Sequence, residues 1–455
     1  MQELLTLCDY TPEEIESESA RIARAFERWD INSEDIARAE ARIRRYLDIN
    51  LIGMRKFLGI WLREFVDMTL ARDEGKSVIY LSYPPLGPLA SGLADMADDV
   101  YCGIPETIIL SVMGQMFGKL EPVLVEAEKI WMPPGQANCE LVAARLGAIL
   151  SGSIPAPTLM LPNGVTCDQV GKVDEILNEL YGIPVAHVDS GFSVESTPPP
   201  HTEEGRVQYL AAELQRVAMS IKALTGHELD EKALTAGRAK FRALRQIYYE
   251  IQDLLRADPV PMSTKDFGII GVLMSSYVKQ AILRGADAGS TLVAELKQRV
   301  MAGEGVLPKG APRVLIVFPH MGDPAVTEVI ENTGLVIAAS SRSLSADKAP
   351  LQYEGTWERA AELILRRGGS VMAMATQMRD LAVEYQVDGV IINTISQCRV
   401  YNLHPIKTKQ VIEAELGIPV LALEHDPYDS REYTLEHFRS RVEPFAEVLR
   451  SRLAA

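Results

Sequence analysis

A short apolar strand, a turn that carries a cysteine, a helix-like stretch and the phrase Gly-Ile-Pro-Val follow one another twice in this chain. The cysteine lies six residues beyond the last apolar residue of the strand in both copies. This order is typical of units in an open α/β sheet, where ligand sites lie at the carboxyl ends of the strands. We therefore predict two similar halves and one shared site in the cleft between them. The first copy comprises residues 158–161, Cys167 and residues 182–185, and the second comprises residues 390–392, Cys398 and residues 417–420.

The rest of the sequence places helical segments around these two halves. Residues 11–74 and 203–300 have the charge and apolar spacing of helices, while short apolar runs alternate with helix-like stretches elsewhere. The predicted fold class is α/β, with two similar parallel-sheet domains that face a cleft. The predicted segments are an N-terminal helical arm (1–76), a first α/β domain (77–200), a helical insert (201–308) and a second α/β domain (309–455).

Composition narrows the class of protein. A chain of 455 residues is expected to form two or three domains. Its net charge of −16 argues against a general nucleic-acid binder, which needs a clustered basic face. No apolar run approaches the roughly 20 residues that cross a bilayer, and the N-terminus does not read as a signal peptide. Five scattered cysteines do not form a secreted disulfide framework. We predict a cytoplasmic protein with reduced thiols.

Three cysteines are candidate ligands: Cys139, Cys167 and Cys398. Each alone is also explained as a buried small hydrophobic residue. As a set they favour ligation, because Cys167 and Cys398 occupy matching places and Cys139 lies one unit upstream. No CxxC pair is present, which argues against a zinc ribbon or a thioredoxin motif. Thiolates from separate loops commonly hold iron–sulfur clusters, and three ligands on a cubane would leave one iron open. Cys8 and Cys102 lack the strand–turn context, and we expect them to be structural.

The segment Gly75-Lys76-Ser77 is not a phosphate-binding loop. A P-loop needs a glycine where Leu70 stands, and it lies between a strand and a helix rather than the reverse. If ATP drives this system, another polypeptide is expected to bind it.

Two histidines and an acidic segment keep two readings each. His320 is either a satisfied loop histidine or a general acid–base group at a strand end. His404 follows Cys398 closely and could orient substrate or groups around it. Residues 424–429 with Arg431 form either charge-paired turns or part of the cleft lining.

Several of these segments together resemble one enzyme family. The chain is similar to subunits of 2-hydroxyacyl-CoA dehydratases and of the related ATP-dependent benzoyl-CoA reductases. The segments that carry this similarity are residues 138–140, 166–168, 388–398, 417–421 and the ending 426–445. The resemblance covers roughly residues 77–450. It is specific for the superfamily and not for the substrate.

The resemblance implies a [4Fe–4S] cluster held by Cys139, Cys167 and Cys398. It also implies a heterodimer with a related sister subunit, and a separate ATP-hydrolysing iron–sulfur activator that supplies one low-potential electron. That electron reduces the CoA thioester to a ketyl radical that expels the hydroxyl group; in the aromatic reductases, electrons enter the ring. The chemistry is that of anaerobic radical enzymes.

The leading hypothesis is therefore the iron–sulfur subunit of a radical 2-hydroxyacyl-CoA dehydratase, a lyase. Three alternatives stay open: a benzoyl-CoA (aryl-CoA) reductase subunit, a non-catalytic electron-relay subunit, and a cofactor-free α/β protein with buried cysteines. No catalytic acid or base is assigned, because Gly87 stands where members of the family often carry a glutamate.

Overall fold

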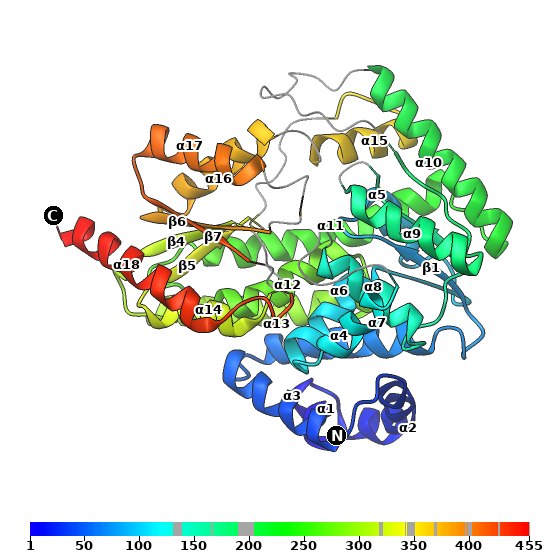
Figure 1. Cartoon of the computed structure of the whole chain (residues 1–455), viewed down its shortest axis with the longest axis horizontal. Coiled ribbons are helices and arrows are strands. Elements are labelled where there is room, and N and C mark those ends of the chain that lie inside the picture. Colours follow the sequence, from blue (N-terminus) through cyan, green and yellow to red (C-terminus); the bar gives the residue numbers. More distant parts are fainter. Residues whose placement is uncertain are drawn as a thin grey trace.

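Two parallel sheets with helices around them make up the computed structural model (Figure 1). It describes residues 1–130, 139–164, 167–189, 204–317, 322–341, 343, 351–367, 371–395, 398, 403–425 and 428–454. The first sheet has the strand order β2-β1-β3 and the second the order β5-β4-β6-β7, with every pairing parallel. The predicted α/β fold class is confirmed. The strands are β1 (Ser77–Leu81), β2 (Val100–Gly103), β3 (Leu159–Leu161), β4 (Arg313–Val317), β5 (Val336–Ser340), β6 (Gly389–Thr394) and β7 (Val420–Glu424).

The helices fall into three groups along the chain. Those before and within the first α/β half are α1 (Gln2–Leu7), α2 (Pro12–Arg28), α3 (Ser33–Tyr46), α4 (Ile52–Leu70), α5 (Gly87–Leu93), α6 (Pro105–Ile109), the π-helical segment η1 (Leu110–Met116), α7 (Glu121–Glu128), α8 (Glu140–Leu150) and α9 (Asp168–Tyr181). The middle group is α10 (Glu204–Thr225), α11 (Glu231–Leu254), α12 (Thr264–Ser276) and α13 (Lys279–Ala302). The last group is α14 (Pro324–Asn332), α15 (Thr356–Arg367), α16 (Val371–Glu384), α17 (Leu403–Leu416) and α18 (Leu435–Ala454).

The two copies of the repeated pattern have the same local structure. In the first, α9 follows β3 and ends at Gly182, after which Val185 forms a parallel bridge with Met160 of β3. In the second, α17 follows β6 and precedes Gly417, after which β7 pairs with β6. Both glycines have positive φ (66° and 65°), a conformation that costs glycine little and lets the chain leave a helix for a strand.

Alternate residues of the second sheet pack into different cores. Val314 of β4 packs with helices α14 and α18, whereas its neighbour Leu315 belongs to the large core on the other face. Successive side chains of a strand point to opposite faces, so a run of apolar residues such as β4 implies a sheet covered on both sides. Helices α16 and α17 contact the sheet as well.

Helices between the two sheets join them into one body (Figure 1). Helix α4 contacts β2 and packs along α13, while α12 contacts both α4 and β5. Gly53 allows the close approach of α4 and α13, since a Cβ there would lie 2.5 Å from the Cβ of Leu292. The sequence pattern of residues 11–74 predicts a helix where α4 lies, and in the structure this helix is buried on nearly every side. The predicted domain boundaries stay a prediction.

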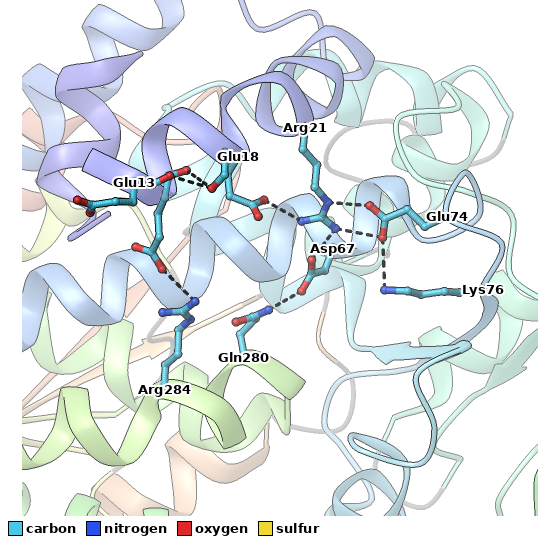
Figure 2. A network of polar contacts seen from close by, with 10 residues as sticks. Glu13, Glu18, Arg21, Asp67, Glu74, Lys76, Gln280 and Arg284 are labelled. Atoms are coloured by element: carbon cyan, nitrogen blue, oxygen red, sulfur yellow. Dashed lines mark hydrogen bonds and ion pairs between the residues drawn. The ribbon is translucent and has the colours of Figure 1, made fainter. Parts of the chain in front are cut away.

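Ion pairs attach α2 to this body. Thr11 and Glu14 form the capping box that begins α2. Figure 2 shows Arg21 of α2 reaching across to carboxylates of the following elements, with Nη2 2.7 Å from Asp67 Oδ1 and Nε 2.7 Å from Glu74 Oε1. The rejection of a P-loop is confirmed, because α4 precedes Gly75 and β1 follows it.

Candidate functional site

Two of the three predicted ligands cap neighbouring helices. Cys139 is the N-cap of α8 and Cys167 is the N-cap of α9, and both side chains are half-buried. The two helices pack against each other. The positive end of a helix dipole favours negative charge, so both positions suit thiolates.

The third predicted ligand lies beyond the second sheet. Cys398 follows the last residue of β6, Thr394, by four positions, and its backbone N–H donates to the carbonyl of Ile395 (2.9 Å). β6 is an inner strand of its sheet. Cys139, Cys167 and Cys398 are all packed, half-buried, against the same large apolar core. Cys167 and Cys398 each follow the carboxyl end of a strand, β3 and β6, whereas Cys139 lies between α7 and α8.

Polar contacts connect the two edges. Arg431, which follows β7, lies with Nη2 2.5 Å from Glu128 Oε1 at the end of α7. Gln115 of η1 donates through Nε2 to the carbonyl of Gly322, at 3.3 Å. Arg42 of α3 pairs with Asp323 at the start of α14, at 3.2 Å. These contacts hold α3 of the N-terminal arm, and η1 and α7 of the first α/β half, against the segments that follow β4 and β7 of the second sheet.

The donor set is chemically suited to an iron–sulfur cluster. Thiolates are the ligands that iron–sulfur clusters prefer, and each cysteine of a cubane binds a different iron. Among the described residues, no group of three His, Cys, Asp or Glu side chains is arranged to hold a single metal ion. Ligands to separate irons need not surround one point, so the three cysteines fit a cluster in the type of their donor atoms. Their assignment as ligands stays a prediction.

A buried ion cluster beside Cys139 and Cys167 was missed by the sequence reading. The Arg145 side chain is fully buried and pairs with two carboxylates that are also fully buried, Glu106 and Asp174. Burial raises the pKa of Glu106, and it raises the pKa of Asp174 to about 7, in both cases against the lowering effect of Arg145. A single charged residue in a helix is usually interpreted as facing solvent, so nothing in the sequence indicated that these three residues are buried together.

A cavity of about 70 Å³ lies at the end of the second sheet. Its apolar walls include Ile391 and Leu423. Its polar lining includes Asn393 of β6 and His425 after β7, which are both buried. Asn393 Oδ1 and His425 Nδ1 have no hydrogen-bond partner among the residues that the structure describes. Buried polar atoms without partners are rare, and here they mark a place where a small polar group or water can bind.

Of the two histidines considered in the sequence, the structure describes His404, whereas His320 lies outside the described residues. His404 is buried in the first turn of α17, and burial lowers its pKa to about 4. Burial, with a smaller effect of His437, lowers the pKa of His425 to about 3. Both His404 and His425 are therefore neutral at pH 7, which suits hydrogen bonding rather than charge pairing.

The remaining residues considered in the sequence, Arg431, Cys8 and Cys102, have structural roles. Arg431 pairs with buried Asp429 at 2.6 Å, which agrees with the charge-paired reading at this end of the acidic segment, while residues 426 and 427 lie outside the described residues. Cys8 and Cys102 are buried, and burial raises the pKa of the Cys8 thiol to about 12 and raises that of Cys102 as well. Neither is suited to be a thiolate ligand. Cys102 lies within β2, a strand that the sequence reading did not name.

Comparison with known proteins identifies the family. Residues 102–449, well over half of the chain, match the family model of the 2-hydroxyglutaryl-CoA dehydratase D-component. The chain therefore belongs to this family of dehydratase subunits, and the resemblance predicted from its motifs is confirmed.

Several relatives are alpha subunits of dehydratases that act on CoA thioesters. The (R)-phenyllactyl-CoA dehydratase alpha subunit of Clostridium sporogenes is 23% identical over 329 residues, which cover 69% of this chain and 76% of the relative. The (R)-2-hydroxyisocaproyl-CoA dehydratase alpha subunit of Clostridioides difficile is 21% identical, with coverage of 69% and 78%. The (R)-2-hydroxyglutaryl-CoA dehydratase alpha subunit of Acidaminococcus fermentans is 19% identical, with coverage of 65% and 61%. In the described part of the chain, no helix combines the length and the apolar character that crossing a membrane requires.

Proposed function

We propose that this chain is the cluster-bearing subunit of a 2-hydroxyacyl-CoA dehydratase that uses radical chemistry. Cys139, Cys167 and Cys398 hold a [4Fe–4S] cluster in this proposal, and the chain works as a heterodimer with a related sister subunit. An ATP-hydrolysing iron–sulfur activator delivers the electron, and the chain acts in an anaerobic cytoplasm. The observation that carries the proposal is the placement of two cysteines as N-caps of packed helices, with the third at the matching edge of the other sheet.

The protein supplies an environment for low-potential chemistry. When bound, a [4Fe–4S] cluster supplies single electrons and, at an iron without a cysteine ligand, a Lewis acid for a substrate oxygen. The N-termini of α8 and α9 stabilise the negative charge of the ligating thiolates. The apolar core packed against all three cysteines excludes water from their inner side.

The cavity beneath the second sheet supports a role in binding the acyl part of the substrate. Its lining is part apolar and part charged, while Asn393 and His425 contribute buried polar atoms that no described residue bonds. A 2-hydroxyacyl group combines an apolar chain with a hydroxyl and a carbonyl oxygen, and it can satisfy both apolar and polar lining. Asn393 belongs to β6 and His425 directly follows β7, in the sheet whose strand β6 precedes Cys398.

Dehydration of a 2-hydroxyacyl-CoA is favoured over reduction of an aryl-CoA. The relatives named above are all dehydratase alpha subunits. Turnover by the purified subunit pair, with activator and ATP, distinguishes the two reactions. We expect loss of water from a 2-hydroxyacyl-CoA and no reduction of benzoyl-CoA. The reverse result would assign the chain to the aryl-CoA reductases.

Metal analysis tests the ligand assignment directly. Anaerobically purified chain is expected to contain about four irons, as a cubane requires. Cys139→Ala, Cys167→Ala and Cys398→Ala should each lose or degrade the cluster signal in electron paramagnetic resonance. Cys102→Ala is the matched control, because that thiol is buried inside β2, and it should retain full iron. An intact cluster in all three ligand variants, or a wild type without iron after reconstitution, contradicts the proposal.

A further inference from the structure

The buried ion cluster joins three helices of the first α/β half. Arg145 of α8 lies with Nη1 3.3 Å from Glu106 Oε1 of α6. Its Nη2 pairs with Asp174 Oδ1 of α9, and it also donates to the carbonyl oxygen of Val170, at 3.4 Å. The side chains of Arg145, Glu106 and Asp174 have no exposed surface. One guanidinium therefore binds two elements other than its own.

The cluster lies just below the two cysteine N-caps. Arg145 follows Cys139 by six residues and Asp174 follows Cys167 by seven, which correspond to about 9 and 10 Å along each helix at 1.5 Å per residue. Glu106 follows the last residue of β2 by three positions. Glu106 thus lies near the carboxyl end of β2, and Arg145 and Asp174 lie in the second turns of the two helices that the cysteines cap.

The two carboxylates hold Arg145 in its charged form. Burial alone lowers the pKa of Arg145, but Asp174 and Glu106, with a smaller effect of Cys167, raise it above the ordinary value. Three charges removed from water are expensive, and apolar residues of similar volume often stabilise a core equally well. A contact that only packed α8 against α9 would not need these three buried charges.

We propose that Arg145 is a positioning residue that fixes the first turns of α8 and α9 relative to each other, so that Cys139 and Cys167 are presented as a pair. The use of that pair as cluster ligands rests on the proposed function. The pairing itself does not, because it concerns only this chain's own helices. The planar guanidinium suits the task, since its fork can bind Glu106 and Asp174 at once while an ammonium group acts as a point charge.

Cross-linking of the cluster-free protein tests the pairing. A short bis-maleimide followed by peptide mass spectrometry should link Cys139 to Cys167 in the wild type. Arg145→Met and Arg145→Lys should reduce that link at least tenfold, because neither side chain holds α6, α8 and α9 together. Circular dichroism establishes that each variant is folded, and if Arg145→Met does not fold, the charge-conserving Arg145→Lys decides the outcome.

Arg313→Met is the matched control. Arg313 is also a buried arginine, and it donates to the backbone carbonyls of Ala257 and Tyr385, but it lies at the first residue of β4, at the opposite end of a strand from any candidate ligand. This variant should lose stability and keep the Cys139–Cys167 link. Reconstituted iron and the paramagnetic resonance spectrum should change in the Arg145 variants and stay unchanged in Arg313→Met.

The outcomes separate this inference from the proposed function. A link that is absent from the wild type, or undiminished in folded Arg145 variants, overturns the positioning role. A link that depends on Arg145 in a protein that binds no iron confirms the positioning role and rejects the cluster. Iron retained at wild-type levels in both Arg145 variants, with an unchanged spectrum, shows that the ion cluster serves stability alone.

Discussion

At the scale of single residues, buried titratable groups have the largest consequences. Cys167 and Cys398 could be matched with each other from their spacing after apolar strands, and Cys139 was added because it lies one unit upstream; their role as ligands stays a prediction. Arg145, Glu106 and Asp174 could not be predicted as a cluster. Each stands in a helix with no periodic signal for burial, and the three meet only after the helices have packed.

His425 should make stability depend on acidity. Its pKa is lowered to about 3 in the folded chain, against about 6.5 in an unfolded one. The unfolded chain therefore binds more protons below pH 6.5, and stability falls as the pH is lowered toward 3. Between pH 7 and pH 5 this histidine should cost roughly 2 kcal/mol.

We expect His425→Phe to remove that loss, since the new ring keeps the edge contact with Phe438. Denaturant unfolding at pH 7 and pH 5 measures it. His437→Gln, an exposed histidine, is the control and should change the difference little. An unchanged difference in His425→Phe would falsify the assignment of His425 as a neutral buried group.

Glu64 should have the opposite dependence. It accepts hydrogen bonds from the Tyr101 hydroxyl (2.9 Å) and the Gln280 N–H (3.1 Å), and burial, followed by the charge of Asp67, raises its pKa to about 8. The folded chain then binds more protons than the unfolded one between pH 4.5 and 8, so stability falls as the pH rises through that window.

Glu64→Gln keeps an acceptor for Gln280 and removes the buried charge. Its stability relative to the wild type should rise by roughly 2–3 kcal/mol between pH 6 and pH 8, measured by denaturant unfolding. Exposed Glu27→Gln serves as the control and should show no such trend. Parallel pH curves for Glu64→Gln and the wild type would contradict the expected protonation of Glu64.

At the scale of elements, the sequence predicted strands well when they were apolar and bounded by turns. β3 and β6 lie where the repeated pattern places apolar strands, at residues 158–161 and 390–392, within a residue or two. β2 was not named, because its four residues are too few to show a period and end in glycine. The positions of α8 and α9 relative to each other were equally inaccessible, since they depend on contacts among helices rather than on either sequence alone.

Close packing of α8 should be sensitive to a single methyl group. A Cβ at Gly147 would lie 1.8 Å from the carbonyl oxygen of Val123 in α7, so backbone must move. We expect Gly147→Ala to cost about 3 kcal/mol and to lower iron content by shifting Cys139 at the start of the same helix. Thermal unfolding and metal analysis measure the two effects.

Gly171→Ala in α9 is the matched control. The nearest atom to a Cβ there is His187 Cε1, at 3.5 Å, which is an ordinary contact. This variant should be neutral or stabilised by up to about 1 kcal/mol, because alanine is the better helix former. Equal losses in the two glycine variants would show that propensity, rather than the α7–α8 approach, decides the result.

At the scale of the whole molecule, a few polar contacts join the two α/β halves. Arg431 connects buried Asp429 to Glu128 of α7 across 303 positions of sequence. Such contacts could not be read from the chain, because neither partner has a local signal for the other. The alternation of strands and helices in the sequence predicts both halves, but only the folded chain shows which contacts hold their edges together.

Arg431→Met should loosen that junction. Hydrogen exchange is expected to increase in α7 and in the segment after β7, with a cost of about 1–3 kcal/mol because Asp429 loses its partner in a buried place. Arg439→Met is the control, since Arg439 pairs only with Glu436 of its own helix on the surface. Unchanged exchange in α7 would show that the junction does not depend on Arg431.

The packing of α4 against α13 has a consequence for synthesis. Helix α4 leaves the ribosome more than two hundred residues before α13, and the side of α4 that packs on α13 stays uncovered until that partner arrives. Contacts between such distant segments form late and slowly. Cys398 and Arg431 emerge later still, more than ninety residues after the end of α13. Any cofactor shared by the two halves can therefore be inserted only after both halves have been synthesised.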